Sequence, residues 1–234
     1  MRKKTGIKIC SVIFALVIIF CIIAGRITAH SYKDNVELDK YLDNKDVKIA
    51  YYGMGYDSVT NRGYLDNDEI QCVDDLKTKD VVIVKARLNS GFKRKIYYEC
   101  ILSKIDIIAC YKGSLKSGDS INIFEPVDCG FKDQILCADG YSMMQQDKEY
   151  ILFLKTLKNT YFGLDKYVYA PNSTLYSKYM IGSEKLKLFS EEELEEHEDM
   201  HLYSEMKEQE VYLYEKTKDD KYLKLKKEVM QKYK

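Results

Sequence analysis

VVIVKARL, residues 81–88, is the stretch of sequence that decides the fold. Four β-branched residues open it, and Ala86 and Leu88 continue the apolar pattern at alternate positions. A short run of this kind predicts a buried β-strand. Asn89-Ser90-Gly91 follows with residue types that favour a tight turn. The chain is therefore expected to leave one buried strand and turn directly into another.

The next run, residues 95–111, is long for a single strand. Tyr98, Cys100 and Leu102 alternate with the residues between them, and the apolar phase shifts after Lys104. A phase shift inside one strand predicts a bulge or a sharp bend. Bends allow one strand to serve both halves of a small closed barrel, and the run therefore favours a barrel.

Shorter apolar runs predict the remaining strands, and turn-forming residues separate them. Residues 126–140 are interpreted as a loop. Together these patterns predict a mainly β fold built around a small closed barrel. The expected additional strands are residues 121–124, 149–155, 162–169 and 179–188.

The order of these segments resembles the OB-fold module of netrins and of tissue inhibitors of metalloproteinases. The resemblance covers about residues 79–156 and implies an OB-like barrel. Those inhibitors act through a mature N-terminal cysteine that chelates the zinc of the target. This chain begins with an apolar segment instead, so the resemblance implies the fold and not the inhibitory mechanism. The shared features are DVVIVKARL at 80–88, a Tyr-rich strand ending in YKG at 111–113, INIF at 121–124, a Cys-containing loop, and KEYILFLK at 148–155.

An uncharged apolar segment at residues 9–25 follows the basic cluster Arg2-Lys3-Lys4. Its length is at the short end for a membrane-spanning helix. By the positive-inside rule, the basic cluster keeps the N-terminus in the cytoplasm. The alternative is a signal peptide cleaved after Ala29, which leaves the rest of the chain on the same side. We therefore predict a single-pass cell-membrane protein whose bulk is extracytoplasmic.

A short helix is expected before the barrel, because Asp66 or Asn67 can cap it while Ile70, Val73 and Leu76 share one side. The tail after the barrel is acidic in its first half and basic in its second, which favours a helical hairpin or one long helix. The expected regions are a transmembrane anchor at 1–30, a stalk with the short helix at 31–78, the OB-like barrel at 79–188 and a charged helical tail at 189–234.

His197-Glu198-Asp199-Met200-His201 matches the H-E-x-x-H pattern of zinc peptidases. On a helix the two His side chains face the same way, and the Glu can act as general base. Acidic residues crowd this match, and their charge favours the imidazolium form, which cannot bind zinc. We therefore expect a solvated helix with no catalytic residue, metal site or cofactor site. A zinc-dependent peptidase using residues 197–201 is the alternative function.

A pair of cysteines and a short basic run are two further candidate features. Cys129 and Cys137 are spaced to close a short loop, and we predict a disulfide between them. Phe92-Lys93-Arg94-Lys95 lies at a predicted hairpin tip. It is interpreted as a solvated turn, with contact to anionic lipid or a wall polymer as the alternative.

The composition excludes several function classes. Lys and Arg number 37 and Asp and Glu number 37, so no net charge draws the chain to nucleic acid. The 21 Tyr and two Pro suit a β-rich extracytoplasmic domain and resemble the usage of low-GC Gram-positive bacteria. No His lies within the predicted barrel to support a Ser-His or Cys-His mechanism. We expect a binding or interaction module, not an enzyme, whose partner is a protein or another cell-surface molecule.

Overall fold

The structure is a computed structural model in which the chain divides into two compact units, residues 1–35 and residues 36–234. The residues that the structure describes are 14, 16–25, 37–43, 46–52, 64–97, 99–129, 133–158, 167–183, 185–189, 201–213 and 216–233.

The first unit contains a helical segment at residue 14 and residues 16–25. Its apolar side chains are exposed, among them Phe14 and Phe20. Within the described part of the chain, no helix combines the length and the apolar character needed to cross a membrane. The predicted anchor at residues 9–25 extends beyond the described residues, and it stays a prediction.

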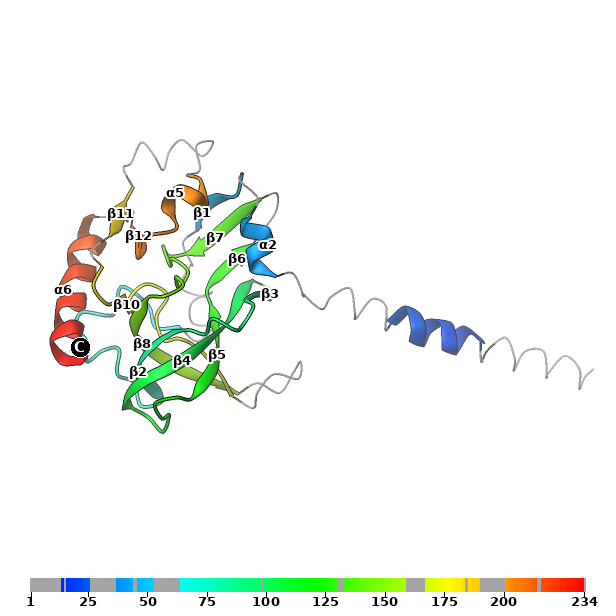
Figure 1. Cartoon of the computed structure of the whole chain (residues 1–234), viewed down its shortest axis with the longest axis horizontal. Helices are drawn as coiled ribbons and strands as arrows, with labels where there is room; N and C mark the ends of the chain where they lie inside the picture. Colours follow the sequence, from blue (N-terminus) through cyan, green and yellow to red (C-terminus); the bar gives the residue numbers. More distant parts are fainter. Residues whose placement is uncertain are drawn as a thin grey trace, which may run out of the picture. The chain divides into compact units, whose positions relative to one another are not determined.

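Five strands of the second unit close into a barrel (Figure 1). Their order around it is β2, β4, β5, β9 and β8, and β8 pairs with β2 to complete the circle. The β5–β9 pair is parallel, and the other pairs are antiparallel. The strands are β2 (Val81–Leu88), β4 (Cys100–Lys112), β5 (Ser120–Glu125), β8 (Glu149–Lys158) and β9 (Tyr167–Pro171).

The prediction of a mainly β fold with a small closed barrel and a C-terminal helix is confirmed. The strand order and the single parallel pair are consistent with an OB-like barrel, which is a five-stranded Greek-key barrel.

Strands β2 and β8 are apolar on both faces because each packs against two cores. Val84 of β2 and Leu152 of β8 face the barrel interior. Ile83 of β2 and Phe153 of β8 belong to a second core outside the barrel. Strands buried on both faces form continuous apolar runs, which explains why VVIV and YILFL are so prominent in the sequence.

Helix α6 (Lys216–Tyr233) covers the second core (Figure 1). Tyr222, Leu225, Val229 and Tyr233 recur every three or four residues, so they share the helix face that is buried against the barrel. The C-terminal helix of the predicted tail is therefore present.

Short strands surround this helix. β10 (Lys178–Met180) pairs with β8, and β11 (Leu186–Leu188) pairs in parallel with β12 (Val211–Leu213). Residues 211–213 of the tail form a strand, and Val211 and Leu213 are buried in the second core. Residues 190–200 of the predicted tail lie outside the described residues.

A separate three-stranded sheet contains β1 (Lys48–Tyr52), β7 (Gln134–Ala138) and β6 (Val127–Cys129) (Figure 1). The interpretation of residues 126–140 as a loop is wrong, because Val127 and Ile135 are buried in a third core with Ile49 of β1. Helices α2 (Leu38–Leu42) and α5 (Tyr203–Met206) add Leu38 and Met206 to that core. The segment expected as a stalk thus supplies one strand of this sheet.

The single long strand predicted at residues 95–111 is two strands, β3 (Lys95–Tyr97) and β4. No bulge occurs at the predicted phase shift, because β4 pairs regularly with β5 through residues 101–106. The register shifts lie further along β4, near residues 108 and 111, where it pairs with β2. Apolar alternation misplaced the bend because Ile101, Leu102 and Ser103 are all buried.

The short helix predicted at residues 66–76 is wrong, since this segment forms turns. The carboxylate of Asp75 accepts hydrogen bonds from the backbone N–H groups of Gln71 and Cys72, each at 2.8 Å. A side chain that captures backbone donors in this way competes with helix formation. The apolar residues Ile70 and Val73 are nevertheless buried, in the second core.

The predicted disulfide between Cys129 and Cys137 is also wrong, because both are free thiols. In the β6–β7 hairpin Cys129 lies opposite Ile135, whereas Cys137 lies opposite Val127. The two cysteines are therefore diagonal neighbours, and diagonal positions are about 7 to 8 Å apart, beyond the usual reach of a disulfide.

Candidate functional site

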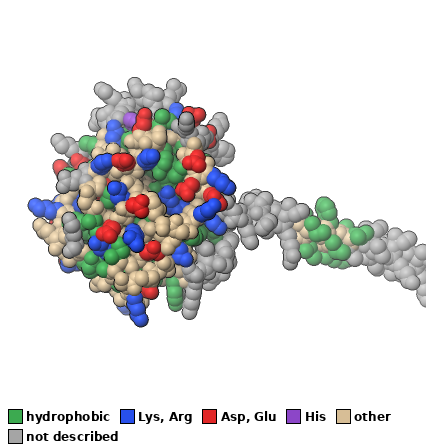
Figure 2. Space-filling model, viewed as in Figure 1, with side chains coloured by type: hydrophobic (Ala, Val, Ile, Leu, Met, Phe, Trp, Pro, Cys, Tyr) green, Lys and Arg blue, Asp and Glu red, His purple; other side chains and the backbone are tan. Residues whose placement is uncertain are grey.

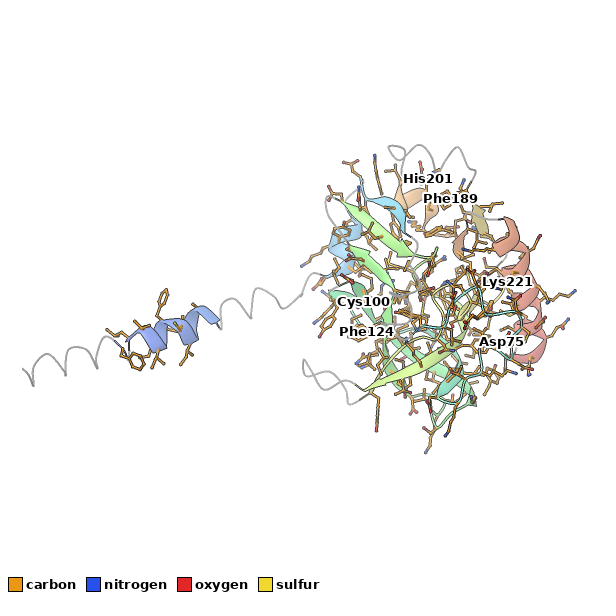
Figure 3. All side chains as sticks on the ribbon, turned by 180° about the vertical axis from the view of Figure 1, so that it is seen from behind. Asp75, Cys100, Phe124, Phe189, His201 and Lys221 are labelled. Atoms are coloured by element: carbon orange, nitrogen blue, oxygen red, sulfur yellow. The ribbon has the colours of Figure 1, made fainter. Side chains whose placement is uncertain are left out.

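The H-E-x-x-H match is described only at its last residue, since residues 197–200 lie outside the described part of the chain. The backbone oxygen of His201 accepts a hydrogen bond from the Ile49 N–H at 2.8 Å. The His201 ring lies 5.4 Å from the Phe189 ring, and Figure 3 shows the two residues together. Among the described residues, no group of three or more His, Cys, Asp or Glu side chains is placed to hold a metal ion.

The basic hairpin tip is partly neutralised by acidic residues around α2. The ammonium group of Lys93 lies 3.1 Å from the Glu37 carboxylate, and the Arg94 guanidinium lies 3.9 Å from that of Asp39. Arg94 also donates to the backbone oxygen of Met144 at 3.0 Å. The tip is thus a structured turn, and it places Arg94 beside a groove.

This groove, of about 580 Å³, is the candidate site. Three segments form it: the loop before β8 at residues 144–148, the end of β10 and the residues after it at 180–183 and 185, and α5 with the residues that follow it, 203–208. Arg94 reaches it from the connection between the barrel strands β2 and β4. Its lining residues are Arg94, Met144, Gln145, Gln146, Lys148, Met180, Ile181, Gly182, Ser183, Lys185, Tyr203, Lys207 and Glu208.

Glu125, the last residue of β5, fixes one side of the groove. Its buried carboxylate accepts hydrogen bonds from the Met144 N–H at 2.7 Å and from the Tyr141 hydroxyl at 3.2 Å. Gln145, which follows Met144 in the chain, donates its N–H to the Tyr150 hydroxyl at 2.8 Å. Because these acceptors belong to the barrel or its core, the loop before β8 is held in one position.

Glu210 fixes the opposite side. Its buried carboxylate accepts hydrogen bonds from the Met180 N–H and from the Tyr222 hydroxyl, both at 2.7 Å, and pairs with Lys226 of α6. Lys226 also donates to the backbone oxygen of Ser183, which lines the groove. The turn after β10 is therefore tied to the C-terminal helix through one carboxylate.

Lys178, the first residue of β10, is also buried and lies close to Glu210. Its ammonium group donates to the backbone oxygen of Glu210 at 3.0 Å and lies 5.0 Å from the centre of the Tyr141 ring. Burial lowers the pKa of Lys178 to about 8, although the charges of Glu210 and Glu125 act in the opposite direction. Two buried carboxylates thus compensate the buried cations Lys178 and Lys226.

The rim of the groove is cationic. Lys148, Lys185 and Lys207 line it together with Arg94, and Glu208 is the one carboxylate among the described lining residues. A hydrogen bond from Lys185, followed by the charges of Lys185, Lys148 and Lys207, holds the pKa of Glu208 below its ordinary value. On the face shown in Figure 2, basic and acidic side chains are interspersed.

Chemically, the groove combines an apolar floor of Met144, Met180 and Ile181 with a positive rim. Such a combination suits a ligand that carries negative charge on an apolar or neutral body. The sequence marks Arg94 as part of the basic tip but does not predict the groove, because the other cations of the groove come from segments far apart in the chain. No local spacing or motif connects them.

Comparison with protein-family models and with curated proteins found no match for this chain. The resemblance of residues 79–156 to netrin and metalloproteinase-inhibitor modules therefore stays a prediction.

Proposed function

We propose that the protein is a membrane-anchored, extracytoplasmic binding module that takes an anionic cell-surface ligand, and not nucleic acid, in the groove around Lys148, Lys185 and Lys207. The observation that carries this proposal is the composition of the groove, whose described lining residues include three lysines and Arg94 but only one carboxylate. Its position supports the same function, because Arg94 lies in the connection between the first two barrel strands. The equivalent loop of OB-folds takes part in ligand binding.

Rigidity of the groove walls also supports a binding role. The buried carboxylates of Glu125 and Glu210 hold the backbone N–H groups of Met144 and Met180, which lie on two sides of the groove. A preformed site avoids the entropic cost of ordering loops when a ligand binds. These buried hydrogen bonds therefore hold in place the groove walls that carry the cationic rim.

The cellular location belongs to the proposal as well. Residues 9–25 serve as the anchor, and the cluster Arg2-Lys3-Lys4 retains the N-terminus in the cytoplasm. We assign an OB-like module of the netrin type to residues 79–156, without the inhibitory mechanism. Protease added to intact cells should remove the part beyond the anchor while leaving an N-terminal tag protected. Cleavage of the tag alone would contradict this orientation.

The binding function is tested by charge reversal. In the full chain, held in neutral phosphatidylcholine nanodiscs, Lys148→Glu, Lys185→Glu and Lys207→Glu are combined. Binding of fluorescent polyglutamate and of a short polyphosphate chain is then measured. We expect a loss of at least about tenfold in affinity for whichever polyanion binds, since three attractions become repulsions.

A charge-matched control reverses three exposed lysines outside the groove, Lys79, Lys116 and Lys224. We expect this control to bind within about twofold of the unmodified chain, because distant surface charges are screened by salt. Equal losses in both triple variants would show that only overall charge matters and would refute the groove as the site. Failure of the unmodified chain to bind either polyanion would refute the function.

A further inference from the structure

Lys185, Lys207 and Glu208 occupy a distinct position at the groove rim. They line the groove and also a neighbouring hollow of about 620 Å³, so they lie where the two meet. Lys185 forms an ion pair with Glu208 there. Lys148 lines the groove and its charge acts on the same carboxylate. The groove therefore holds three lysines together with one carboxylate, which is in direct contact with Lys185.

The position of these three lysines indicates where an anion binds in the groove. Three lysines close together repel one another unless a negative charge lies between them. In the structure that charge is supplied by Glu208, which leaves the cluster with more positive than negative charge. The side chains of Lys185 and Glu208 are 60% and 64% exposed, and exposed ion pairs are weak. A competing anion of higher charge can therefore replace the carboxylate without unfolding any element.

We propose that Glu208 occupies the anion position of the groove as a built-in competitor, and that a phosphate group is the external oxyanion that displaces it. This inference rests on the proposed function and specifies the ligand chemistry and its control. Phosphate carries more negative charge than a carboxylate and offers more acceptor oxygens to the three ammonium groups. Both free phosphate and a lipid phosphomonoester present this chemistry, whereas a phosphodiester carries only one negative charge.

Removal of the competitor is the diagnostic change. Glu208→Gln keeps the size of the side chain and removes its charge, so the lysine cluster becomes more attractive to an external anion. We expect the affinity for inorganic phosphate to rise about fivefold at low salt. The gain should shrink at high salt, because both partners are exposed to solvent. Glu69→Gln, which makes the same charge change at an exposed residue outside the groove, should leave the affinity unchanged.

The experiment is isothermal titration calorimetry on the full chain in neutral nanodiscs. One arm uses inorganic phosphate, and a second uses dihexanoyl-phosphatidic acid, a soluble lipid phosphomonoester, so the two sources of phosphate are distinguished. In each arm the unmodified chain, Glu208→Gln, Glu69→Gln and Lys207→Ala are compared. The expected result is tighter binding by Glu208→Gln and weaker binding by Lys207→Ala in at least one arm.

Two results overturn the inference. Equal or weaker binding by Glu208→Gln shows that the carboxylate does not compete. Absence of phosphate binding in both arms, by every variant, shows that phosphate is not the ligand chemistry. Either result leaves the proposed function standing if polyglutamate binding still depends on the groove lysines. Loss of that dependence is the separate result that refutes the proposed function.

Discussion

Replacing Glu210 by Gln tests how the groove is held together. This substitution keeps the shape of the side chain and removes the charge that faces Lys226. The side chain of Glu210 is fully buried, and that of Lys226 is 9% exposed. Leaving one partner of a buried ion pair uncompensated costs about 3 to 5 kcal/mol. Buried Lys178 loses a neighbouring negative charge in the same change.

We expect the lower end of that range, about 3 kcal/mol, because the Gln oxygen can still accept from the Met180 N–H and the Tyr222 hydroxyl. With a urea m value of about 2 kcal/mol/M, the unfolding midpoint should fall by about 1.5 M. Glu208→Gln is the matched control, since it removes a paired carboxylate that is 64% exposed, and its midpoint should not change. Equal midpoints for the two variants would refute the reasoning that Glu210 stabilises the groove.

Three further predictions concern Lys178, Cys129 and Glu198. Because burial lowers the pKa of Lys178 to about 8, the folded state releases this proton before the unfolded state does, and stability should rise between about pH 8 and about pH 10.5. Lys178→Met should reduce that slope by up to about 1.4 kcal/mol per pH unit in urea titrations, and an undiminished slope would contradict the assignment. Burial raises the pKa of the Cys129 thiol to about 12, so the thiol should be alkylated much faster in urea than in buffer, as mass mapping of labelled peptides can check. Glu198→Gln should leave stability and any peptide cleavage unchanged, and stoichiometric zinc together with cleavage abolished by this change would instead establish the peptidase.

Much of the barrel could be predicted from the sequence, because its strands carry strong local signals. VVIVKARL and EYILFLK are apolar on both faces, and each forms a strand as expected. Residues 126–140 were misread because β6 and β7 are short and are stabilised by pairing with each other and with distant β1. Such pairing is set by tertiary contacts, which override local propensity.

The candidate site was less predictable than the fold. Arg94 stood out as part of a basic run, whereas Lys148, Lys185 and Lys207 are each ordinary surface residues in their local sequence. The buried role of Glu210 was hidden as well, since it follows a highly acidic stretch that indicates a solvated helix. Only the packing of α6 against β10 turns this Glu into the acceptor for Met180 and Lys226.

The central claim is that an anionic ligand binds in the groove, and methyl NMR of the methionines tests it most directly. Met144 and Met180 line the groove, whereas Met230 lines a hollow against α6. Addition of a short polyphosphate to the whole protein in nanodiscs should shift the methyl signals of Met144 and Met180. The methyl signal of Met230 should not move. Shifts confined to Met230, or no shift at Met144 and Met180 under saturating ligand, would contradict the claim.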